Sequence, residues 1–408
     1  MGTLNAKFRF NKAGQGCFYT GWLRNETGCF SMAYDCGTHS SHEYLKNEIG
    51  KFHVDLKIRS KGKLDLLIIS HFDDDHVNEL SELLKGISEV EYIILPYLTP
   101  LLRLGVYLSH GETGGDFQSF LTDPVGFLTT RGAVVKNIIF IDGDDLTGDN
   151  FPADNTPEPP SGEDFFSCNH TELKPIDKAT KTEYKNDDRV IFLKDKGRFF
   201  IGNVWEFYFY NKPLSEDILL AFFAEMHGRF PALYNGNILT QTELQAIFDS
   251  TRIAEIKDLY RHSLENRNLN YTSLIVYHGP VYRNAKDIDG YYYKNRHGYW
   301  REFHESAQST LLMGDIYLTG LIFPRYINTK REKIGVLQIP HHGSETLWDF
   351  TVLSALINPW IIAVINFGLG NTHKHPRQTV IDDIKSHGWK IKLNHQLKAF
   401  KYFVRFSY

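Results

Sequence analysis

Short apolar runs separated by turn residues predict an alternation of strands and helices in the first part of the chain. Three runs predict strands, at Phe8–Phe10, Phe18–Leu23 and Phe30–Tyr34. The acidic turn Asp35-Cys36-Gly37 is expected to end the third strand. A helix, a strand, a helix and a strand then follow over residues 41–50, 64–70, 77–87 and 91–98. This βαβ-like rhythm is typical of α/β proteins.

The middle of the chain differs in composition from the parts on either side. Residues 141–188 are polar and rich in Asp, Glu, Pro and Gly, so they are predicted to form a flexible surface insertion. Residues 213–266 show helical periodicity. We therefore expect two halves of one domain, 1–140 and 267–408, interrupted by an insertion over 141–266.

Strand patterns return after the helical segment and continue to the end of the chain. A single helix, over 378–387, interrupts them. The strands are predicted at Thr272–Tyr277, Ser309–Met313, 335–339, 361–366, 389–393 and 399–405.

Composition narrows the class of protein. The chain has 408 residues, of which 42% are hydrophobic and 23% charged, as expected for a globular protein with a sizeable core. Its net charge of −4 means that nucleic acid could be bound only through a local patch. The four Cys lack paired ligand spacing and are expected to be buried thiols in a reducing compartment. No apolar segment is long enough to span a bilayer, so we expect a cytoplasmic protein without a membrane partner.

The most informative segment is Ser70–His76, which follows the apolar run Leu64–Ile69. It places two imidazoles and three consecutive carboxylates on a loop between a strand and a helix. Consecutive Asp side chains repel one another unless a cation is shared among them. An ordinary acidic loop with an Asp N-cap would account for one carboxylate, but not for His71 and His76. The segment therefore predicts a metal site.

Three later strand ends also carry His or Asp. An apolar strand ends in Gly314-Asp315, and another leads into His341-His342-Gly343-Ser344. A third leads toward His373 and His375. Each element alone has an ordinary structural interpretation. Together they favour one site, because sites in open α/β sheets gather at the carboxyl edge of the strands.

This series of motifs resembles the metallo-β-lactamase fold, and more narrowly the nuclease-like domain of ComEC-type DNA-uptake proteins. In that family Asp replaces the second His of the superfamily's His-x-His-x-Asp-His, as Asp73 does here. Gln15-Gly16 also resembles an early turn of the family. The resemblance implies an αββα sandwich, of class α/β, with a large flexible and helical insertion. It covers residues 8 to 390 but excludes most of 99–266.

The resemblance also implies two divalent metals, Zn or Mn, and assigns ligands to them. One metal would be bound by His71 and Asp73, and the other by Asp75 and His76. Asp315 would bridge the two metals. By similarity to phosphorylcholine esterases of this fold, His342 would bind the second metal, while His341 and Ser344 would face the phosphate. Asp35 is expected to be a turn residue that supports a ligand rather than a ligand itself.

Two departures from the superfamily pattern concern the first metal. The superfamily supplies another His to this metal, and here four residues are candidates by position only: His110, His170, His227 and His262. The carboxylate of Asp73 makes the site richer in oxygen, which shifts the preference from zinc toward manganese.

The expected reaction is hydrolysis of a phosphodiester by hydroxide generated between two cations. Asp75, His341 and His375 are the residues assigned to catalysis. His341 or His375 would offset charge on the phosphate oxygens. His375 could instead protonate the leaving oxygen, or could merely cap the region before Pro376. For His373 we favour simple surface exposure.

The segment Tyr291–Arg301 combines aromatic and basic residues. Tyr293, Lys294 and Arg296 are candidates for stacking on bases and contacting phosphates of single-stranded nucleic acid. A twisted β-hairpin would explain the same composition.

Three functions are consistent with these sequence features. The first is a metal-dependent phosphodiesterase, expected to be a nuclease acting on nucleic acid or another phosphodiester. The second is a hydrolase of small esters, lactones or non-nucleic phosphoesters. The third is a partner-dependent subunit of a bacterial defence or DNA-processing complex.

Overall fold

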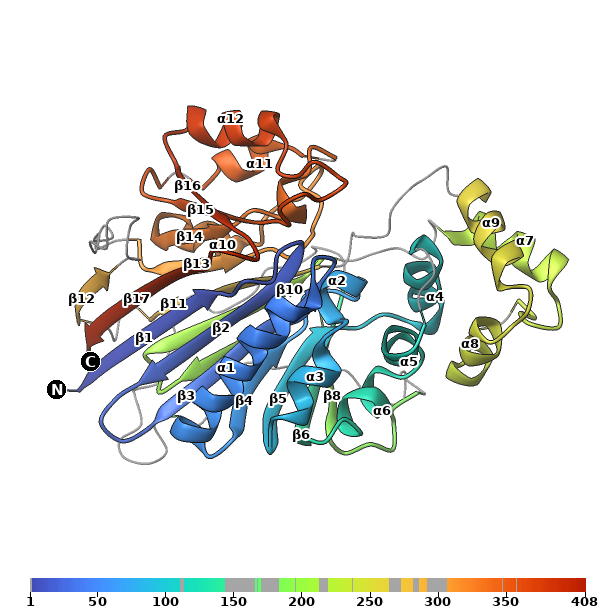
Figure 1. The fold of residues 1–408 in the computed structure, drawn as a ribbon, viewed down its shortest axis with the longest axis horizontal. Helices are drawn as coiled ribbons and strands as arrows, with labels where there is room; N and C mark the ends of the chain where they lie inside the picture. Colours follow the sequence, from blue (N-terminus) through green and yellow to red (C-terminus); the bar gives the residue numbers. More distant parts are fainter. Residues whose placement is uncertain are drawn as a thin grey trace.

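The computed structural model describes residues 2–110, 114–143, 166, 168–169, 183–194, 196–212, 219–236, 238–263, 273–281, 286–291, 307–346, 348–356 and 358–408. Two β-sheets lie at the centre of the molecule, with helices on their outer sides (Figure 1). The two termini lie side by side, because the first and last strands pair with each other.

Nine of the described strands form the first sheet, here called sheet A. From β3 onward the strands of this sheet run parallel, so their carboxyl ends meet at one edge. In spatial order sheet A contains β12 (Lys286–Tyr291), β17 (Phe400–Ser407), β1 (Thr3–Phe10), β2 (Gly16–Arg24), β3 (Cys29–Thr38), β4 (Lys63–Ile68), β5 (Glu89–Pro96), β6 (Val134–Asp142) and β8 (Val190–Lys194).

Eight of the described strands form the second sheet, sheet B. Its parallel part runs from β13 to β16, which again brings carboxyl ends together at one edge. In spatial order sheet B contains β16 (Lys390–Asn394), β15 (Ile362–Asn366), β14 (Ile334–Gln338), β13 (Ser309–Leu312), β11 (Leu274–Pro280), β10 (Trp205–Asn211), β9 (Lys196–Ile201) and β7 (Cys168–Asn169).

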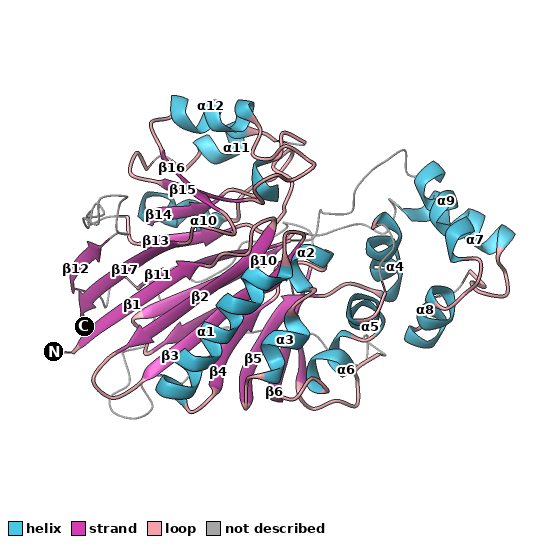
Figure 2. Cartoon of the chain, in the orientation of Figure 1, coloured by secondary structure: helices cyan, strands magenta, loops and turns pink. Residues whose placement is uncertain are grey.

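Helices cover the outer faces of both sheets (Figure 2). Helix α1 shows why: Leu45, Ile49, Phe52 and Leu56 recur at helical spacing and are buried. The helices on the side of sheet A are α1 (His42–Ser60), α2 (Asp74–Val77), α3 (Leu80–Lys85), α4 (Pro100–Ser109), α5 (Asp116–Thr122) and α6 (Pro124–Thr129). Those on the side of sheet B are α10 (Arg325–Lys330), α11 (Phe350–Ser354) and α12 (Gln378–Ser386), with the short 3₁₀ turns η4 (Arg331–Lys333) and η5 (His341–Gly343).

The hydrophobic core is divided among the layers. One cluster lies between the sheets, where Phe8 of sheet A packs on Trp205 of sheet B. A second joins sheet A to its helices, and a third joins sheet B to α10, α11 and α12. The expected αββα sandwich is confirmed, because each sheet buries one face on the other sheet and one face under helices.

The helical segment forms α7 (Leu220–Arg229), α8 (Gln241–Phe248) and α9 (Ile253–Ser263). These helices do not lie on a sheet but at one end of the molecule (Figure 1). Helices α8 and α9 pack against α4, and α8 also packs against α5, while α7 packs on α9. Phe222, Met226 and Leu244 belong to the same apolar cluster as the helices over sheet A. The segment therefore extends the core on the side of the expected site.

Three local expectations differ from the structure. The predicted helix over 77–87 is two short helices, α2 and α3, and α2 already begins at Asp74. The third strand does not end at Asp35 but continues to Thr38, past an irregularity in its pairing with β2. Residues 190–211, which were placed within the insertion, supply β8 to sheet A and β9 and β10 to sheet B. Among the described residues no helix is both long and apolar enough to cross a membrane.

Candidate metal centre

The loop after β4 brings four potential ligands to the carboxyl edge of sheet A. The chain leaves the sheet at Ile68, and α2 begins only six residues later. Asp73 occupies the N-cap position of α2, yet its side chain makes no capping hydrogen bond to a described residue. Capping therefore does not explain this carboxylate. The buried potential ligands of the loop are His71, Asp73, Asp75 and His76.

Asp74, the middle of the three consecutive aspartates, bonds elsewhere. Its Oδ2 lies 3.1 Å from Nε2 of His39 and accepts a hydrogen bond of 2.9 Å from Asn78. Burial alone would raise the pKa of Asp74, but these two contacts lower it. The repulsion among the three carboxylates is thus reduced, and only Asp73 and Asp75 remain for the cluster.

Two glycines allow the loop to lie directly on the strands beneath it. A Cβ atom on Gly16, where φ is +140°, would come within 2.5 Å of the carbonyl oxygen of Asp75. A Cβ atom on Gly37 would come within 2.5 Å of the backbone carbon of the same residue. Any larger residue at either position would push the ligand loop away from the sheet.

Asp35 is the hydrogen-bond centre beneath the loop. Its carboxylate is fully buried and accepts a bond of 2.7 Å from the backbone N–H of Ser70. It also accepts bonds of 2.7 Å from the Ser70 hydroxyl and from Nδ1 of His76. Burial raises the pKa of Asp35, and the contacts with His76 and Ser70 oppose that rise. This agrees with a supporting role for Asp35.

These bonds orient the two histidines of the loop. His76 donates from Nδ1 to Asp35, so its Nε2 faces the interior. Because the Ser70 hydroxyl donates to Asp35, its oxygen accepts from Nδ1 of His71, 2.8 Å away. Nε2 is buried in both rings and has no hydrogen-bond partner among the described residues. The described groups at ion-pair distance from these two nitrogens are carboxylates, Asp315 for His76 and Asp73 for His71. Buried imidazole nitrogens beside carboxylates, each ring held through its Nδ1, are what a metal ion requires.

Asp35, His71 and His76 also lie close enough together to be counted as a possible ligand group. Asp35 is not expected to bind a metal itself, because its two oxygens already accept hydrogen bonds from Ser70 and from Nδ1 of His76. We therefore regard this carboxylate as the support of two ligands.

A second group of potential ligands combines residues of this loop with Asp315, which follows β13, and His342, which follows β14. Nε2 of His342 lies 3.0 Å from Oδ2 of Asp75, and the two residues are 267 positions apart in the chain. The carboxylate of Asp315 has one oxygen 3.3 Å from Nε2 of His76 and the other 3.5 Å from Nε2 of His342. Nδ1 of His342 donates to the carbonyl of Asn366 at 3.1 Å, which leaves Nε2 for a ligand role. Ligand atoms of Asp75, His76 and His342 all lie within 4.8 Å of one another.

The backbone of this second group is strained. His341 and His342 have φ angles of +50° and +56°, in the left-handed region that favours glycine. Asp35 also lies in this region, with φ of +52°. Each such residue costs about 1–3 kcal/mol and persists only where the surroundings enforce it. The concentration of this strain beside the carboxylates and imidazoles favours a functional role for the loop.

The other end of the cluster contains His71, Asp73 and His110. Nε2 of His71 lies 3.8 Å from Oδ2 of Asp73, and Nε2 of His110 lies 4.0 Å from Oδ1 of the same carboxylate. His110 follows α4, and its Nδ1 donates a hydrogen bond to the carbonyl of Val106 at 2.8 Å. Its Nε2 is therefore the atom that could bind a metal. The fold thus distinguishes His110 from the other positional candidates.

Of those other candidates, the two that the structure describes do not reach the cluster. His227 and His262 are exposed on α7 and α9, and Nδ1 of His262 is bonded to the carbonyl of Asp258. His170 lies outside the described residues.

The charges of the cluster fit a bound cation. Burial alone would raise the pKa of Asp75, but His76 and His342 lower it. Burial alone would lower the pKa of His76, but Asp315 is the strongest of the carboxylates that raise it. In the metal-free protein, protons on imidazoles compensate the carboxylates, and a divalent cation would displace them. Burial and the nearby His76 lower the pKa of His71 to about 4, so this ring is neutral at pH 7 and ready to coordinate.

His341 and His375 lie beside the second group and face each other, with ring centroids 5.9 Å apart. Tyr317 packs on the other side of His341, at 5.6 Å. Nδ1 of each histidine is buried and has no hydrogen-bond partner among the described residues. Burial, followed by the charges of His342 and His341, lowers the pKa of His375 to about 4. His373 is exposed and stacks on His375 at 5.5 Å.

Of the four residues expected to bind substrate, only Ser344 belongs to the described residues. The hydroxyl oxygen of Ser344 is buried and accepts a hydrogen bond of 3.1 Å from the backbone N–H of Thr346. This bond stabilises the loop and leaves the hydroxyl hydrogen available. The candidates Tyr293, Lys294 and Arg296 lie outside the described residues.

Two supporting residues were not recognised from the sequence. Ser273 was expected only to begin a strand, but its hydroxyl accepts a bond of 3.1 Å from the backbone N–H of Asp315. Tyr260 of α9 is buried, and the charge of Asp73 contributes, after burial, to raising its pKa, but its hydroxyl makes no hydrogen bond to a described residue and so does not hold the cluster in place. In addition, Nζ of Lys257 donates to the carbonyl of His110 at 3.4 Å. Helix α9 therefore supports the part of the cluster that contains His110.

We expect His110→Ala to reduce the metal content of the protein. Removing this imidazole leaves His71 and Asp73 as the described side chains at their end of the cluster, so a metal bound there should be lost on dialysis. Elemental analysis of purified protein measures the metal content. His262→Ala, which removes an exposed imidazole on α9, is the matched control. Equal metal content in both variants would contradict the assignment of His110.

Comparison with known proteins does not assign this chain to a family. No protein-family model and no curated protein matches the chain. The metallo-β-lactamase fold protein YhfI from Bacillus subtilis aligns over 97% of this chain and 99% of that chain, with 9% identity and a TM-score of 0.35. Unliganded yeast PDE1 aligns over 100% of both chains, with 8% identity and a TM-score of 0.39. At these values neither likeness supports an argument about this chain, and the narrower resemblance to ComEC-type proteins stays a prediction.

Proposed function

We propose that this protein is a metal-dependent hydrolase of phosphodiester bonds and acts as a nuclease. The observation that carries the proposal is the buried convergence of Asp75, His76, Asp315 and His342 from three separate strand ends. A buried group of this composition is costly for a fold unless it binds a cation.

Two divalent cations fit the available donors. His71, Asp73 and His110 would hold one of them, and Asp75, His76 and His342 the other, with Asp315 between the two groups. Bound there, the cations would activate water for attack on phosphorus and offset charge on the phosphate oxygens. Imidazole and carboxylate donors suit zinc or manganese, and the oxygen of Asp73 favours manganese.

The residues beside the second group would position the substrate. The neutral rings of His341 and His375 can each donate one N–H to a phosphate oxygen. A bound phosphodiester would raise the pKa of His375 from about 4, because a nearby negative charge favours the imidazolium. His375 could then hold a proton for the leaving oxygen. Ser344 could donate its remaining hydroxyl hydrogen to the same phosphate.

We expect labelled single-stranded DNA or RNA to be cleaved in the presence of Mn²⁺ or Zn²⁺ and to remain intact with EDTA. Asp75→Ala should abolish this cleavage, because it removes the carboxylate that faces His342. Asp258→Ala, an exposed substitution on α9, should cleave like the wild type and controls for the effect of substitution and purification themselves. Cleavage that persists in Asp75→Ala would assign the activity to another protein.

The same scaffold could act on small esters, lactones or non-nucleic phosphoesters. A protein that binds two metals, leaves every nucleic acid intact and hydrolyses such a compound would replace the nuclease proposal. Participation in a bacterial defence or DNA-processing complex and a cytoplasmic location stay predictions from the sequence.

A further inference from the structure

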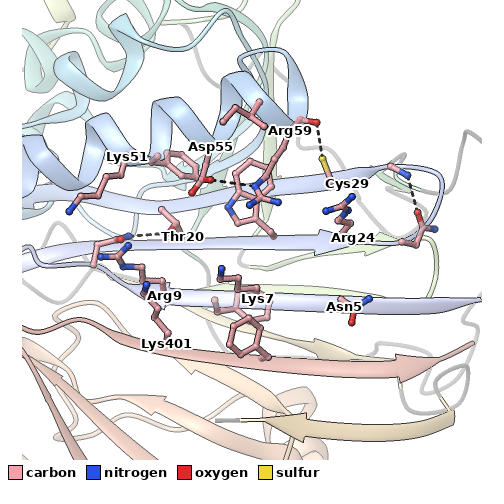
Figure 3. A pocket seen from close by; sticks show the side chains of 18 of the residues that line it. Asn5, Lys7, Arg9, Thr20, Arg24, Cys29, Lys51, Asp55, Arg59 and Lys401 are labelled. Atoms are coloured by element: carbon pink, nitrogen blue, oxygen red, sulfur yellow. Dashed lines mark hydrogen bonds and ion pairs between the residues drawn. The ribbon is translucent and has the colours of Figure 1, made fainter. Parts of the chain in front are cut away.

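A groove lies on the outer face of sheet A, away from the metal-ligand cluster. It has a volume of about 640 Å³, and its floor is made by alternate residues of β1, β2 and β17. Helix α1 forms one wall (Figure 3). None of the described residues that line it belongs to the candidate metal centre. The fold and the metal centre leave this groove without a role.

The groove is strongly basic, although the chain as a whole carries a net charge of −4. Its described lining contains six cationic and only three acidic side chains. The cationic ones are Lys7, Arg9, Arg24, Lys51, Arg59 and Lys401. The local patch that nucleic-acid binding would require in an acidic protein is therefore present.

The acids of the groove neutralise only part of these cations. Asp55 pairs with Arg59 at 3.4 Å. Glu48 is buried and is shared between Arg9 and Lys51. Lys7, Arg24 and Lys401 have no carboxylate at ion-pair distance within the described part of the chain. Positive charge is therefore left over along the length of the groove.

Two of the cations face each other in a way that costs stability. Arg9 and Lys401 are direct partners in the pairing of β1 with β17. Like charges directly opposite each other in a sheet are destabilising. Burial, and then the charges of Arg9 and Lys7, lower the pKa of Lys401. Nε of Arg9 is buried and has no hydrogen-bond partner among the described residues. A bound anion would relieve each of these conditions.

Aromatic rings lie among the cations. The half-buried ring of Trp22 lies under the guanidinium of Arg59, at 5.5 Å from the ring centroid. The half-buried ring of Phe403 lies under Nζ of Lys7, at 5.4 Å. A basic groove with interleaved aromatic rings is the arrangement used to bind single strands, whose bases are free to stack. A duplex keeps its base faces stacked on one another and gains nothing from such rings.

The groove follows the strands that lead to the metal centre. Its floor on β1 runs from Asn5 to beyond the strand end at Phe10, roughly 20 Å at 3.4 Å per residue. The next strand begins at Gly16, whose backbone lies against the carbonyl of Asp75. A nucleic-acid strand in the groove is thus directed along the sheet toward the edge that carries the metal ligands.

We propose that this groove binds the phosphate backbone of single-stranded nucleic acid, with Lys7, Arg9 and Lys401 contacting phosphates and Trp22 and Phe403 contacting bases. The assignment deepens the proposed function by naming its substrate class, and it rests on that function only for the link between binding and cleavage.

Binding is measured by fluorescence anisotropy with a labelled single-stranded DNA of about 15 nucleotides. EDTA is present, so no metal can bind the phosphates. The double variant Lys7→Ala/Lys401→Ala should bind at least about tenfold more weakly. The slope of the logarithm of the binding constant against the logarithm of the salt concentration should become shallower by about 1.4, or about 0.7 for each lost phosphate contact. Lys385→Ala/Lys390→Ala, which removes two exposed lysines on the side of sheet B, should bind like the wild type.

A second variant separates binding from folding. Lys401→Glu places a carboxylate opposite Arg9, so its melting temperature should equal or exceed that of the wild type while its affinity for the oligonucleotide falls. If Lys401 had only a structural role, Lys401→Glu would lower the melting temperature of the protein and leave its affinity for the oligonucleotide unchanged. Unchanged affinity in Lys401→Glu and in the double alanine variant would overturn the proposal.

Competition and hydrolysis assays identify the ligand class. Duplex DNA or heparin that displaces the strand with equal affinity would overturn the choice of single-stranded nucleic acid. Hydrolysis of bis(p-nitrophenyl) phosphate with Mn²⁺ tests the metal centre independently, and the groove variants should keep the wild-type rate. Binding that depends on the groove, without hydrolysis of any diester, would support the groove and refute the proposed function. Hydrolysis without groove-dependent binding would support the proposed function and refute the role of the groove.

Discussion

Asp315→Asn is expected to reduce the proposed phosphodiesterase activity at least about a thousandfold, as follows from losing about 4 kcal/mol of transition-state stabilisation. The two oxygens of this carboxylate lie 3.3 Å from Nε2 of His76 and 3.5 Å from Nε2 of His342. Asparagine keeps the shape of the side chain but loses its charge and one acceptor oxygen. Hydrolysis of bis(p-nitrophenyl) phosphate and the bound metal per chain are the two measurements.

The reason for so large an effect is the position of Asp315 between the groups of the centre. Burial alone would raise its pKa, but His342 and His76 hold it well below the ordinary value. The carboxylate is therefore ionised and available to a cation over the whole neutral range. Asp382→Asn, an exposed substitution on α12, is the control for the chemical change itself. Activity and metal content that stay at the wild-type level in Asp315→Asn would refute a role for this carboxylate in the centre.

Asp35→Asn is expected to weaken metal binding about 10- to 100-fold, although Asp35 is not assigned as a ligand. Its carboxylate accepts bonds from Ser70 and from Nδ1 of His76, and through Ser70 it also orients His71. In asparagine one of the two oxygens becomes an NH₂ group, which cannot accept these bonds. The unfolding free energy should also fall by about 1–3 kcal/mol, because buried donors lose their partners. Metal titration and thermal unfolding measure the two effects.

The neighbouring strand supplies a matched control for Asp35. Asp65 accepts bonds of 2.7 and 2.8 Å from the backbone and hydroxyl of Ser31, with no histidine attached. Burial raises the pKa of Asp65, as it does that of Asp35. We expect Asp65→Asn to lose stability while keeping its metal affinity. An equal loss of metal affinity in both variants would mean that Asp35 acts only through the stability of the fold.

Much of the fold could be predicted because its strands are short apolar runs. The apolar residues of Leu64–Ile69 and of the run before Gly314 are all buried and could hardly belong to anything but central strands. The strands of residues 190–211 were missed because the polar segment before them suggested an insertion. A local signal was present, since Trp205–Asn211 is rich in aromatic residues and is buried at every position.

The candidate site was predictable in its chemistry but not in its pairing. His71, Asp73, Asp75 and His76 are neighbours in the chain, so their common loop is visible in the sequence. Which distant histidine completes each end of the cluster depends on where α4 and β14 end in space. Four candidates were equal in sequence, and His110 is distinguished by its approach to Asp73.

The ligand atoms and their places after strand ends could be predicted from the chain alone, because hydrophobic periodicity and residue chemistry are local properties. The role of Asp35 in orienting two histidines, and the single groove shared by cations of β1, β2 and β17, became visible only in the folded protein. Hydrogen bonds and electrostatic contacts depend on distances of a few ångströms between residues that are far apart in the chain. Those distances are set by how the two sheets and their helices pack, which no short window of sequence contains.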